Sequence, residues 1–169
     1  LGEILSDLEQ IGAYAKKLYE CTKDEYFVSI LFHYAFDMMD SCMMQEMFDM
    51  AEGYLHMAET YVKCPYIQNG KTWWHLECRL VMNAVTLYYR MGEKEKWSIY
   101  LNRAEELFAN EAEKNKSKDR ANRVVLWRER IEYMKLRRLW EEAHDVAGTR
   151  PKVMAYLERV SQVLDEHEL

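Results

Sequence analysis

Residues that interrupt helices are scarce in this chain of 169 residues, which holds only 6 Gly and 2 Pro. An all-β domain needs frequent Gly- and Pro-containing turns between its strands, so this scarcity argues against one. Hydrophobic residues make up 49% of the chain and charged residues 31%, a balance that excludes a disordered polypeptide. Because the long segments are rich in Leu, Ala, Glu, Lys, Arg and Met, we predict an all-α fold.

A long apolar run is also missing. No segment approaches the roughly 20 apolar residues that a membrane-spanning helix needs, and no signal peptide is visible. The four cysteines, Cys21, Cys42, Cys64 and Cys78, are too few for a disulfide scaffold in a chain of this length. All but Cys64 stand among apolar neighbours, where a free thiol behaves as a small hydrophobic group. We therefore expect a cytoplasmic protein with no membrane partner.

Familiar catalytic motifs are absent, including Gly-x-Ser-x-Gly, His-Glu-x-x-His and a phosphate-binding Gly-rich loop. Cys64, His75 and Cys78 would supply three zinc ligands, but no fourth candidate stands at a motif spacing. Glu141 and His144 form one Glu-x-x-His pair, a unit that di-iron bundles use twice. We therefore expect no cofactor, no metal and no catalytic residues in this chain, and predict that it is not an enzyme.

The formal net charge is −6, with acidic and basic residues interspersed. This balance argues against a general nucleic-acid-binding protein, which usually carries a basic excess. The local exception is a basic stretch from Lys114 to Arg138, which Glu129, Glu132 and several apolar residues interrupt. We interpret it as a solvated helix face. A nucleic-acid-associated regulator that uses a basic helix over 118–138 stays open as an alternative.

Two helices joined by a tight turn are predicted between Lys71 and Asn110. Apolar residues three and four apart mark one face of the first helix: Leu76, Leu80, Ala84, Leu87 and Met91. The same spacing returns after the turn: Trp97, Leu101, Ala104, Leu107 and Phe108. Gly92 can take the left-handed conformation that ends a helix, and Arg90 is well placed in the last turn. This segment is therefore predicted to be a helical hairpin.

The same periodicity predicts further helices on both sides, which brings the total to about seven. They are expected over 2–21, 26–40, 45–62, from Ser117 or Asp119 to about Val146, and over 152–166. Breaks are expected at 22–24, near 40–45, in a loop over 64–70 and at 148–151. Asp24 and Thr72 are placed to cap the helices that follow them, and Pro151 to stop a helix.

Small residues recur on the second helix of each presumed hairpin. Ala51 and Ala58 are seven residues apart in the earlier hairpin, as are Trp97 and Ala104 in the central one. Small side chains at such positions let two helices approach closely, and the stacking of helical hairpins requires this. The spacing therefore prompts a comparison with helical-repeat proteins.

The chain resembles the tetratricopeptide-repeat family, whose features the central hairpin carries as Ala84, Tyr88, Gly92 and Ala104. It departs from the family's pattern at Trp97, where a small residue is normal, and at Glu46, where a turn Gly is usual. No closing Pro follows Phe108, and the loop over 64–70 lengthens the repeat interval.

The resemblance, which covers about half of the chain, implies one domain over 1–169. In it, antiparallel helical hairpins would stack into a short α-solenoid. An irregular helical bundle would show the same periodicity and stays open as an alternative.

The resemblance further implies that the first helix of each hairpin lines a concave groove, which binds a peptide or a partner helix. Carried over by position, the groove residues are His33, Phe36, Asp37, Asp40, Arg79, Met82, Asn83 and Thr86. Arg79 and Asn83, one turn apart, would grip a backbone or carboxylate through charge-assisted hydrogen bonds. The alternative is that both are ordinary surface residues.

An aromatic pair, Trp73-Trp74, follows the loop and has Tyr66 close by in sequence. If exposed, this pair is a good anchor for a protein partner or a sugar ring. If buried, it fastens the loop to the helix.

These observations predict a non-catalytic protein–protein interaction domain that serves as a scaffold or as a sensory or regulatory part. Because the sequence begins with Leu1 and not Met, we expect a portion of a longer protein. The alternative from another class is an all-α accessory domain of a multidomain enzyme, whose catalytic residues lie outside this chain.

Overall fold

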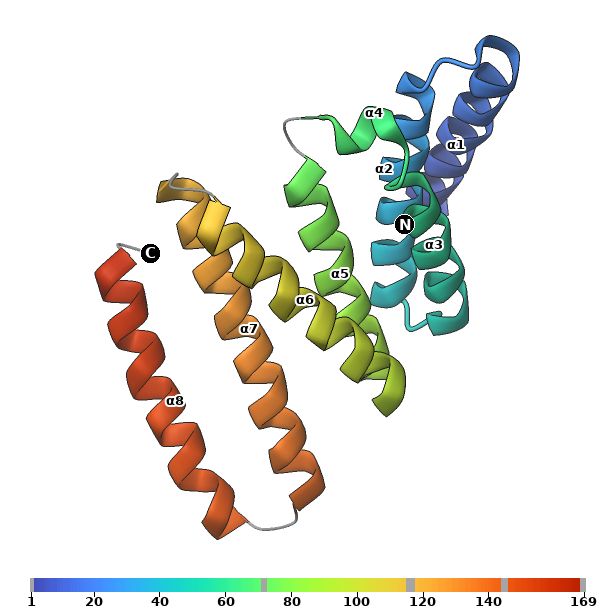
Figure 1. Cartoon of the computed structure of the whole chain (residues 1–169). Helices are drawn as coiled ribbons and strands as arrows, with labels where there is room; N and C mark the ends of the chain where they lie inside the picture. The colour runs from blue at the N-terminus through green and yellow to red at the C-terminus, as the bar shows by residue number, and fades with distance from the viewer. Residues whose placement is uncertain (1, 71–72, 115–117, 144–145, 168–169) are drawn as a thin grey trace. The chain divides into compact units, whose positions relative to one another are not determined.

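Helices account for nearly all of the described residues in the computed structural model (Figure 1). They are α1 (Gly2–Thr22), α2 (Tyr26–Met44), α3 (Phe48–Tyr61), α4 (Pro65–Gln68), α5 (Trp73–Met91), α6 (Lys94–Lys114), α7 (Lys118–Ala143) and α8 (Val146–His167). The structure describes residues 2–70, 73–114, 118–143 and 146–167, with side chains at 6–70, 75–109, 123–142 and 148–163. No strand occurs within these ranges, so the prediction of an all-α fold is confirmed. Among the described helices, none combines the length and the hydrophobicity that crossing a bilayer requires.

Two helix boundaries differ from the predictions. The expected stop at 148–151 is wrong, because α8 begins at Val146 and continues through Pro151. Pro151 is the sixth residue of α8, beyond the first turn, so it removes a backbone donor that would otherwise bond within the helix, and the helix continues in spite of this cost. The segment 64–70 was expected to be a loop, but it contains α4, whose first residue is Pro65. The fixed φ of proline favours this first helical position, and the extra turn makes eight helices within the described residues, against about seven expected.

The chain divides into two compact units, Leu1–Ala104 and Glu105–Leu169, which are described separately here. In the first unit, α2 packs against both α1 and α3, and α5 packs against α2 and α3. One cluster of buried side chains from α2, α3, α4 and α5 forms the core of this unit. Its largest members are Phe32, Phe36, Met39, Leu55, Leu80, Leu87 and Tyr88. The prediction of a single domain over 1–169 stays a prediction.

The helical hairpin predicted between Lys71 and Asn110 is confirmed by α5, α6 and the turn between them. Gly92 has a φ of 75°, the left-handed conformation expected of it. Its N–H donates to the carbonyl of Tyr89, and the next N–H, of Glu93, donates to the carbonyl of Tyr88. The ring of Tyr88 stacks on that of Tyr100 with centroids 5.2 Å apart, which holds the two helices together.

The turn between α2 and α3 uses a charged residue where glycine would be less strained. Glu46 has a φ of 61°, a conformation that costs a residue with a Cβ roughly 1–2 kcal/mol. Arg90 of α5 stabilises this turn through two hydrogen bonds. It donates to the carbonyl of Met43 and to the carboxylate of Glu46. The Glu that breaks the expected sequence pattern therefore still adopts the backbone shape of a turn glycine.

In the second unit, α7 and α8 pack side by side (Figure 1). The ring of Phe108, in the last part of α6, stacks on Trp127 of α7 with centroids 5.6 Å apart. Among the described side chains of α7, the buried apolar ones are Val124, Ile131 and Met134. The Tyr156 hydroxyl of α8 donates to the backbone carbonyl of Glu129 at 3.0 Å, which ties the two helices together.

Two helical glycines provide a matched test of packing. A Cβ built on Gly12 of α1 would lie 2.7 Å from the ring of Tyr34, whereas one built on Gly53 of α3 would meet nothing within 4 Å. Alanine has the higher helix propensity, so Gly53→Ala should raise the free energy of unfolding by about 0.5–1 kcal/mol. Gly12→Ala should lower it, because overpacking costs roughly 1–3 kcal/mol. Urea titrations of both variants check this.

The wild-type chain is the common reference for both glycine variants. Equal effects in the two variants would contradict the close approach of α1 to α2 at Gly12.

Candidate functional site

The predicted groove residues do lie on two neighbouring helices, α2 and α5, but they differ in exposure. His33, Asp37 and Arg79 are exposed. Phe36 and Met82 are buried in the core, where they pack and do not face solvent. Asp40, Asn83 and Thr86 are half-buried, and the Thr86 hydroxyl donates to the Met82 carbonyl of its own helix. The side chains of Trp73 and Trp74 lie outside the described residues.

Two contacts join the predicted residues of α2 to those of α5. The Arg79 guanidinium lies over the Phe36 ring, 4.5 Å from its centroid. The Asn83 side-chain amide donates to the Asp40 carboxylate, although the residues are 43 positions apart in sequence. Arg79 and Asn83 therefore contact α2 in this structure, and their role in gripping a partner stays a prediction.

The Asp40–Asn83 contact predicts a measurable coupling between the two helices. We expect Asn83→Ala to lower the free energy of unfolding, because a half-buried hydrogen bond to a carboxylate is lost. A double-mutant cycle with Asp40→Ala should give a coupling energy of about 1 kcal/mol by urea denaturation. His33→Ala, which alters an exposed side chain of α2, is the control and should change stability by no more than about 0.5 kcal/mol. A coupling energy of zero would mean that the contact does not join α2 and α5.

Charged and hydroxyl groups of α3, α5 and α6 form a network beside the core. Glu52 of α3 accepts hydrogen bonds from the Tyr88 hydroxyl at 2.9 Å and from Lys96 at 2.7 Å. One turn further along α3, Glu59 accepts from the Tyr100 hydroxyl at 2.9 Å and from Arg103 at 3.0 Å. Both carboxylates of α3 are therefore held by donors on other helices.

This network moves the pKa values of Glu52, Tyr88 and Tyr100 further from neutral pH. The hydrogen bond from Lys96, with help from Tyr88, lowers the pKa of Glu52 although partial burial acts against this. Burial, together with a carboxylate acceptor, raises the pKa of both Tyr88 and Tyr100. Groups that transfer protons near neutral pH need pKa values close to 7, and the pKa values of these groups lie further away. Their hydrogen bonds between helices fit a structural role instead.

The lowered pKa of Glu52 predicts a pH-dependent stability. The network stabilises the fold above the unfolded-state pKa of Glu52, which is ordinarily 4.5, and this stabilisation is lost as pH falls through the lower folded-state value. Near neutral pH we expect Glu52→Gln to reduce the free energy of unfolding by about 1–2 kcal/mol. This deficit should shrink as the pH is lowered below 4.5, which urea titrations at several pH values will measure.

Glu106→Gln, at an exposed site of α6, is the control and should show no such trend. A deficit for Glu52→Gln that stays constant with pH would contradict the network.

A hollow of about 760 Å³ lies beside the amino-terminal part of α2. Its lining comes from α2, from the segment around α4 and from α5: Glu25, Ser29, His33, Pro65, Tyr66, Ile67, Asn69, Gly70 and Leu76. His33 is the one predicted groove residue in this lining. Tyr66, which the sequence places near the aromatic pair, is about half exposed here.

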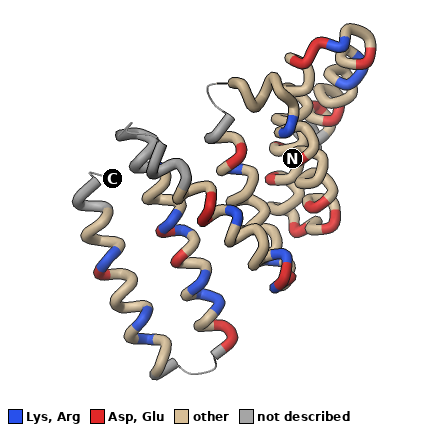
Figure 2. The backbone as a smooth tube through the Cα atoms, viewed as in Figure 1, with Lys and Arg blue, Asp and Glu red and all other residues tan. Residues whose placement is uncertain are grey.

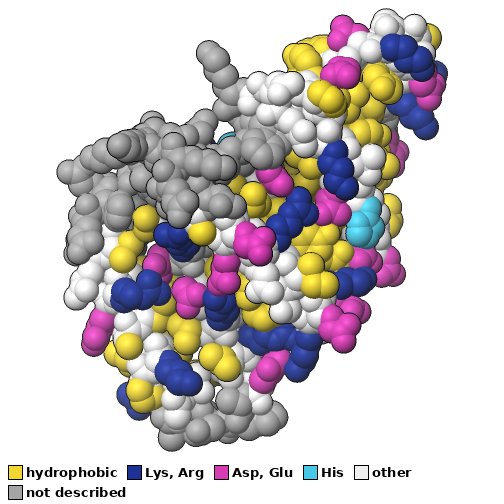
Figure 3. Space-filling model, viewed as in Figure 1, with side chains coloured by type: hydrophobic (Ala, Val, Ile, Leu, Met, Phe, Trp, Pro, Cys, Tyr) yellow, Lys and Arg dark blue, Asp and Glu magenta, His cyan; other side chains and the backbone are white. Residues whose placement is uncertain are grey.

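An apolar cleft of about 300 Å³ lies between α7 and α8. Its lining is aromatic and aliphatic with one cation: Tyr133, Leu136, Arg137, Trp140, Val153, Tyr156 and Leu157. Three of these residues remain well exposed, Tyr133 at 49%, Trp140 at 45% and Leu157 at 53%. Apolar side chains reach the surface among charged ones in the region of α7 and α8 (Figure 3).

Sequence reasoning missed this cleft, although a signal for it exists. The four lining residues of α7 stand at i, i+3, i+4 and i+7, and those of α8 at i, i+3 and i+4. This spacing was interpreted as ordinary core periodicity, and only the structure shows that the two stripes face a shared cleft.

Three of the described basic residues of α7 are paired with carboxylates, and charges of both signs occur along this helix in Figure 2. Arg137 and Arg138 each donate to a Glu four residues later, at 2.9 Å in both cases. Lys135 binds both Glu105 and Glu132. These pairs support the interpretation of the basic stretch as a solvated helix face.

Within the described residues, no three His, Cys, Asp or Glu side chains lie close enough together to bind one metal ion. The zinc hypothesis on Cys64, His75 and Cys78 falls within these residues, whereas His144 of the Glu-x-x-His pair lies outside them. The four cysteines are free thiols, with Cys42 and Cys78 buried.

No family model, no curated protein and no solved structure matches the chain.

Proposed function

We propose that this chain is a non-catalytic interaction domain of tetratricopeptide-like helical hairpins, which binds an amphipathic helix of a partner protein. The exposed aromatic cleft between α7 and α8 is the observation that supports this proposal. Apolar patches that remain open to solvent and are bordered by polar residues mark interaction sites in many proteins. The four free cysteines support a reducing, cytoplasmic setting for this role.

The residue types in the cleft suit a protein partner. Trp and Tyr carry most of the binding energy in many interfaces, because they bury a large area and lose little side-chain entropy. Trp140, Tyr133 and Tyr156 all line this cleft. A volume of about 300 Å³ is enough for one or two apolar side chains of the partner.

The shape of the cleft favours a helix as its occupant. The seam between two packed helices can take a third helix, whose side chains at i, i+3 and i+4 fill the gap between them. Arg137 is the only charged residue of the cleft lining among the described residues, and it already donates to Glu141 at 2.9 Å. The cleft therefore selects the apolar side chains of a partner helix.

The proposal predicts which peptides the chain will select. From a displayed library of amphipathic helical peptides, the wild-type chain should enrich sequences with aromatic and aliphatic anchors at helical spacing. Trp140→Ala should weaken binding of a selected peptide by about tenfold or more, as truncation of an interface anchor does. Fluorescence anisotropy with the labelled peptide measures both affinities.

Leu126→Ala is the matched control, because Leu126 is on the same helix with a comparable exposure of 41% and does not line the cleft. It should bind the peptide as the wild-type chain does. Failure to enrich any peptide, or equal binding by Trp140→Ala, would refute the proposed function.

A further inference from the structure

Helix α1 carries an apolar stripe that its own unit does not cover. Gly12 and Ala15 are buried on the face of α1 that packs against α2. Ile11, Tyr14 and Leu18 remain 50%, 64% and 45% exposed. Ile11 and Tyr14 each precede a buried residue, and consecutive side chains leave a helix about 100° apart. The outer stripe therefore lies beside the packed face and is open to solvent.

The outer stripe has the spacing of a seam between two paired helices. Five exposed residues of α1 stand four, three, four and three positions apart: Asp7, Ile11, Tyr14, Leu18 and Cys21. This alternation is the heptad pattern through which two helices pack their side chains together. The seam is about two heptads long, which suits a pairing of folded domains better than an independent coiled coil.

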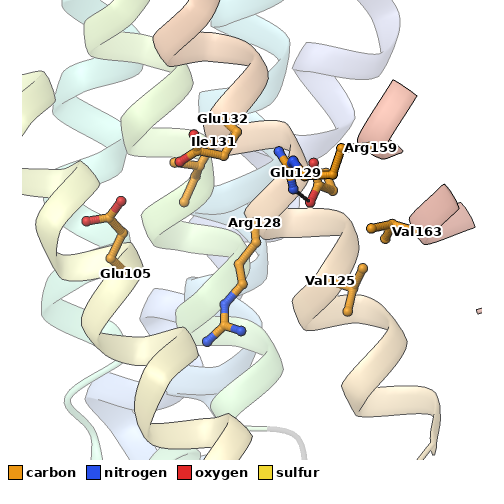
Figure 4. Close-up of a pocket in the computed structure, with 8 residues that line it drawn as sticks. All are labelled: Glu105, Val125, Arg128, Glu129, Ile131, Glu132, Arg159 and Val163. Atoms are coloured by element: carbon orange, nitrogen blue, oxygen red, sulfur yellow. Dashed lines mark hydrogen bonds and ion pairs between the residues drawn. The ribbon is translucent and has the colours of Figure 1, made fainter. Parts of the chain in front are cut away.

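Charged side chains next to the stripe have no ion-pair partner among the described side chains. Asp7 lies at one end of the stripe, and Lys17 borders Leu18 near the other end. The charged cavity of the Glu105–Leu169 unit is different, because there Arg159 of α8 binds Glu129 of α7 (Figure 4). Asp7 and Lys17 are therefore available to a partner.

The order of charges along α1 is complementary to itself when the helix is reversed. Acidic Asp7 and Glu9 stand in the first half of the helix and basic Lys16 and Lys17 in the second, with Glu20 as the exception. An antiparallel second copy therefore brings each acidic half beside a basic half. A two-fold arrangement of this kind uses the same patch on both chains and closes as a dimer.

Charge also selects the orientation and the register of the pair. With Ile11 against Tyr14 of the second copy, Asp7 lies beside Lys17 of the second copy. Pairing Tyr14 with Leu18 of the second copy would instead bring the two Lys17 side chains together. A parallel pair would bring the two Asp7 side chains together. Because like charges repel, the antiparallel register centred between Ile11 and Tyr14 is favoured.

We propose that α1 is a homodimer interface, in which its exposed stripe packs antiparallel against the same stripe of a second copy of this chain. Ile11 and Tyr14 form the centre of the interface, and two Asp7–Lys17 pairs flank it. A single pair of helices buries an area at the low end of specific interfaces, below about 1,200 Å², so the dimer is weak. This surface and the helix-binding cleft belong to different units, and neither proposal depends on the other.

Sedimentation equilibrium of the full chain, between about 1 and 200 μM, measures the association. We expect a monomer–dimer equilibrium with a Kd on the order of 10–100 μM. Ile11→Asp should weaken dimerisation about tenfold or more, because it places a carboxylate from each chain in the centre of the interface. Ile99→Asp is the matched control, since it makes the same change at an exposed isoleucine of α6, and it should dimerise as the wild-type chain does. Circular dichroism establishes that both variants are folded.

A charge reversal tests the register. Lys17→Glu should weaken the dimer about fivefold or more, because both ion pairs become repulsive. Adding Asp7→Lys to this variant restores opposite charges, so the double variant should recover wild-type affinity to within about twofold. Lys16→Glu is the control, since this side chain leaves α1 away from the stripe, and it should have little effect.

Brief oxidation tests the orientation. In the proposed pair the two Cys21 residues lie near opposite ends of the interface, roughly 25 Å apart, whereas in a parallel pair they face each other. Mass spectrometry of the oxidised dimer should therefore find no disulfide between the two Cys21 residues.

A chain that stays monomeric at about 200 μM would overturn the proposal. So would a dimer that folded Ile11→Asp leaves intact, or a disulfide that joins Cys21 to Cys21 of the second copy. Loss of the dimer in Trp140→Ala, with Ile11→Asp still dimeric, would place self-association in the helix-binding cleft instead of on α1.

Discussion

The Leu1–Ala104 unit depends on the close approach of helices at alanine residues. Ala35 of α2, Ala51 and Ala58 of α3, and Ala84 of α5 are all fully buried in its core. A larger side chain at any of them would push two helices apart, since a packed core has no room to absorb extra volume. The short distance between helices also lets carboxylates of α3 reach tyrosine hydroxyls on α5 and α6. Packing and the polar network are therefore two results of one constraint.

Among the described side chains of the Glu105–Leu169 unit, few are buried, and the candidate binding cleft lies in this unit. Large apolar side chains remain substantially exposed there: Tyr133, Leu139, Trp140, Met154 and Leu157. Aromatic side chains held open to water contribute little to folding and are suited to an interface. Glu129 of the same unit keeps one carboxylate oxygen buried, with no donor among the described residues. The open aromatic side chains and this unpaired oxygen both cost folding free energy.

Helical periodicity was enough to predict the all-α fold and the hairpin of α5 and α6, because apolar spacing and a turn glycine are local signals. It failed at Pro151, because a proline beyond the first turn usually ends or kinks a helix, whereas α8 continues through this one. It also could not show that Phe36 and Met82 are buried or that Asn83 meets Asp40. Those facts depend on how α2 and α5 align, and this alignment is set by the packing of residues far apart in the sequence. The cleft between α7 and α8 was missed for the same reason.

The electrostatics of α7 help to choose between the remaining functional readings. Nucleic-acid affinity grows with the number of cations available to neutralise phosphates. On α7, Lys135, Arg137 and Arg138 are each bound to carboxylates of the same chain, so a phosphate would have to compete with these partners. Within α7, ion pairs between residues three and four apart keep charged side chains on the same helix as the apolar stripe of Tyr133, Leu136 and Trp140. The part of α7 that holds these three paired cations and the open aromatic residues is therefore better suited to an apolar partner than to a polyanion.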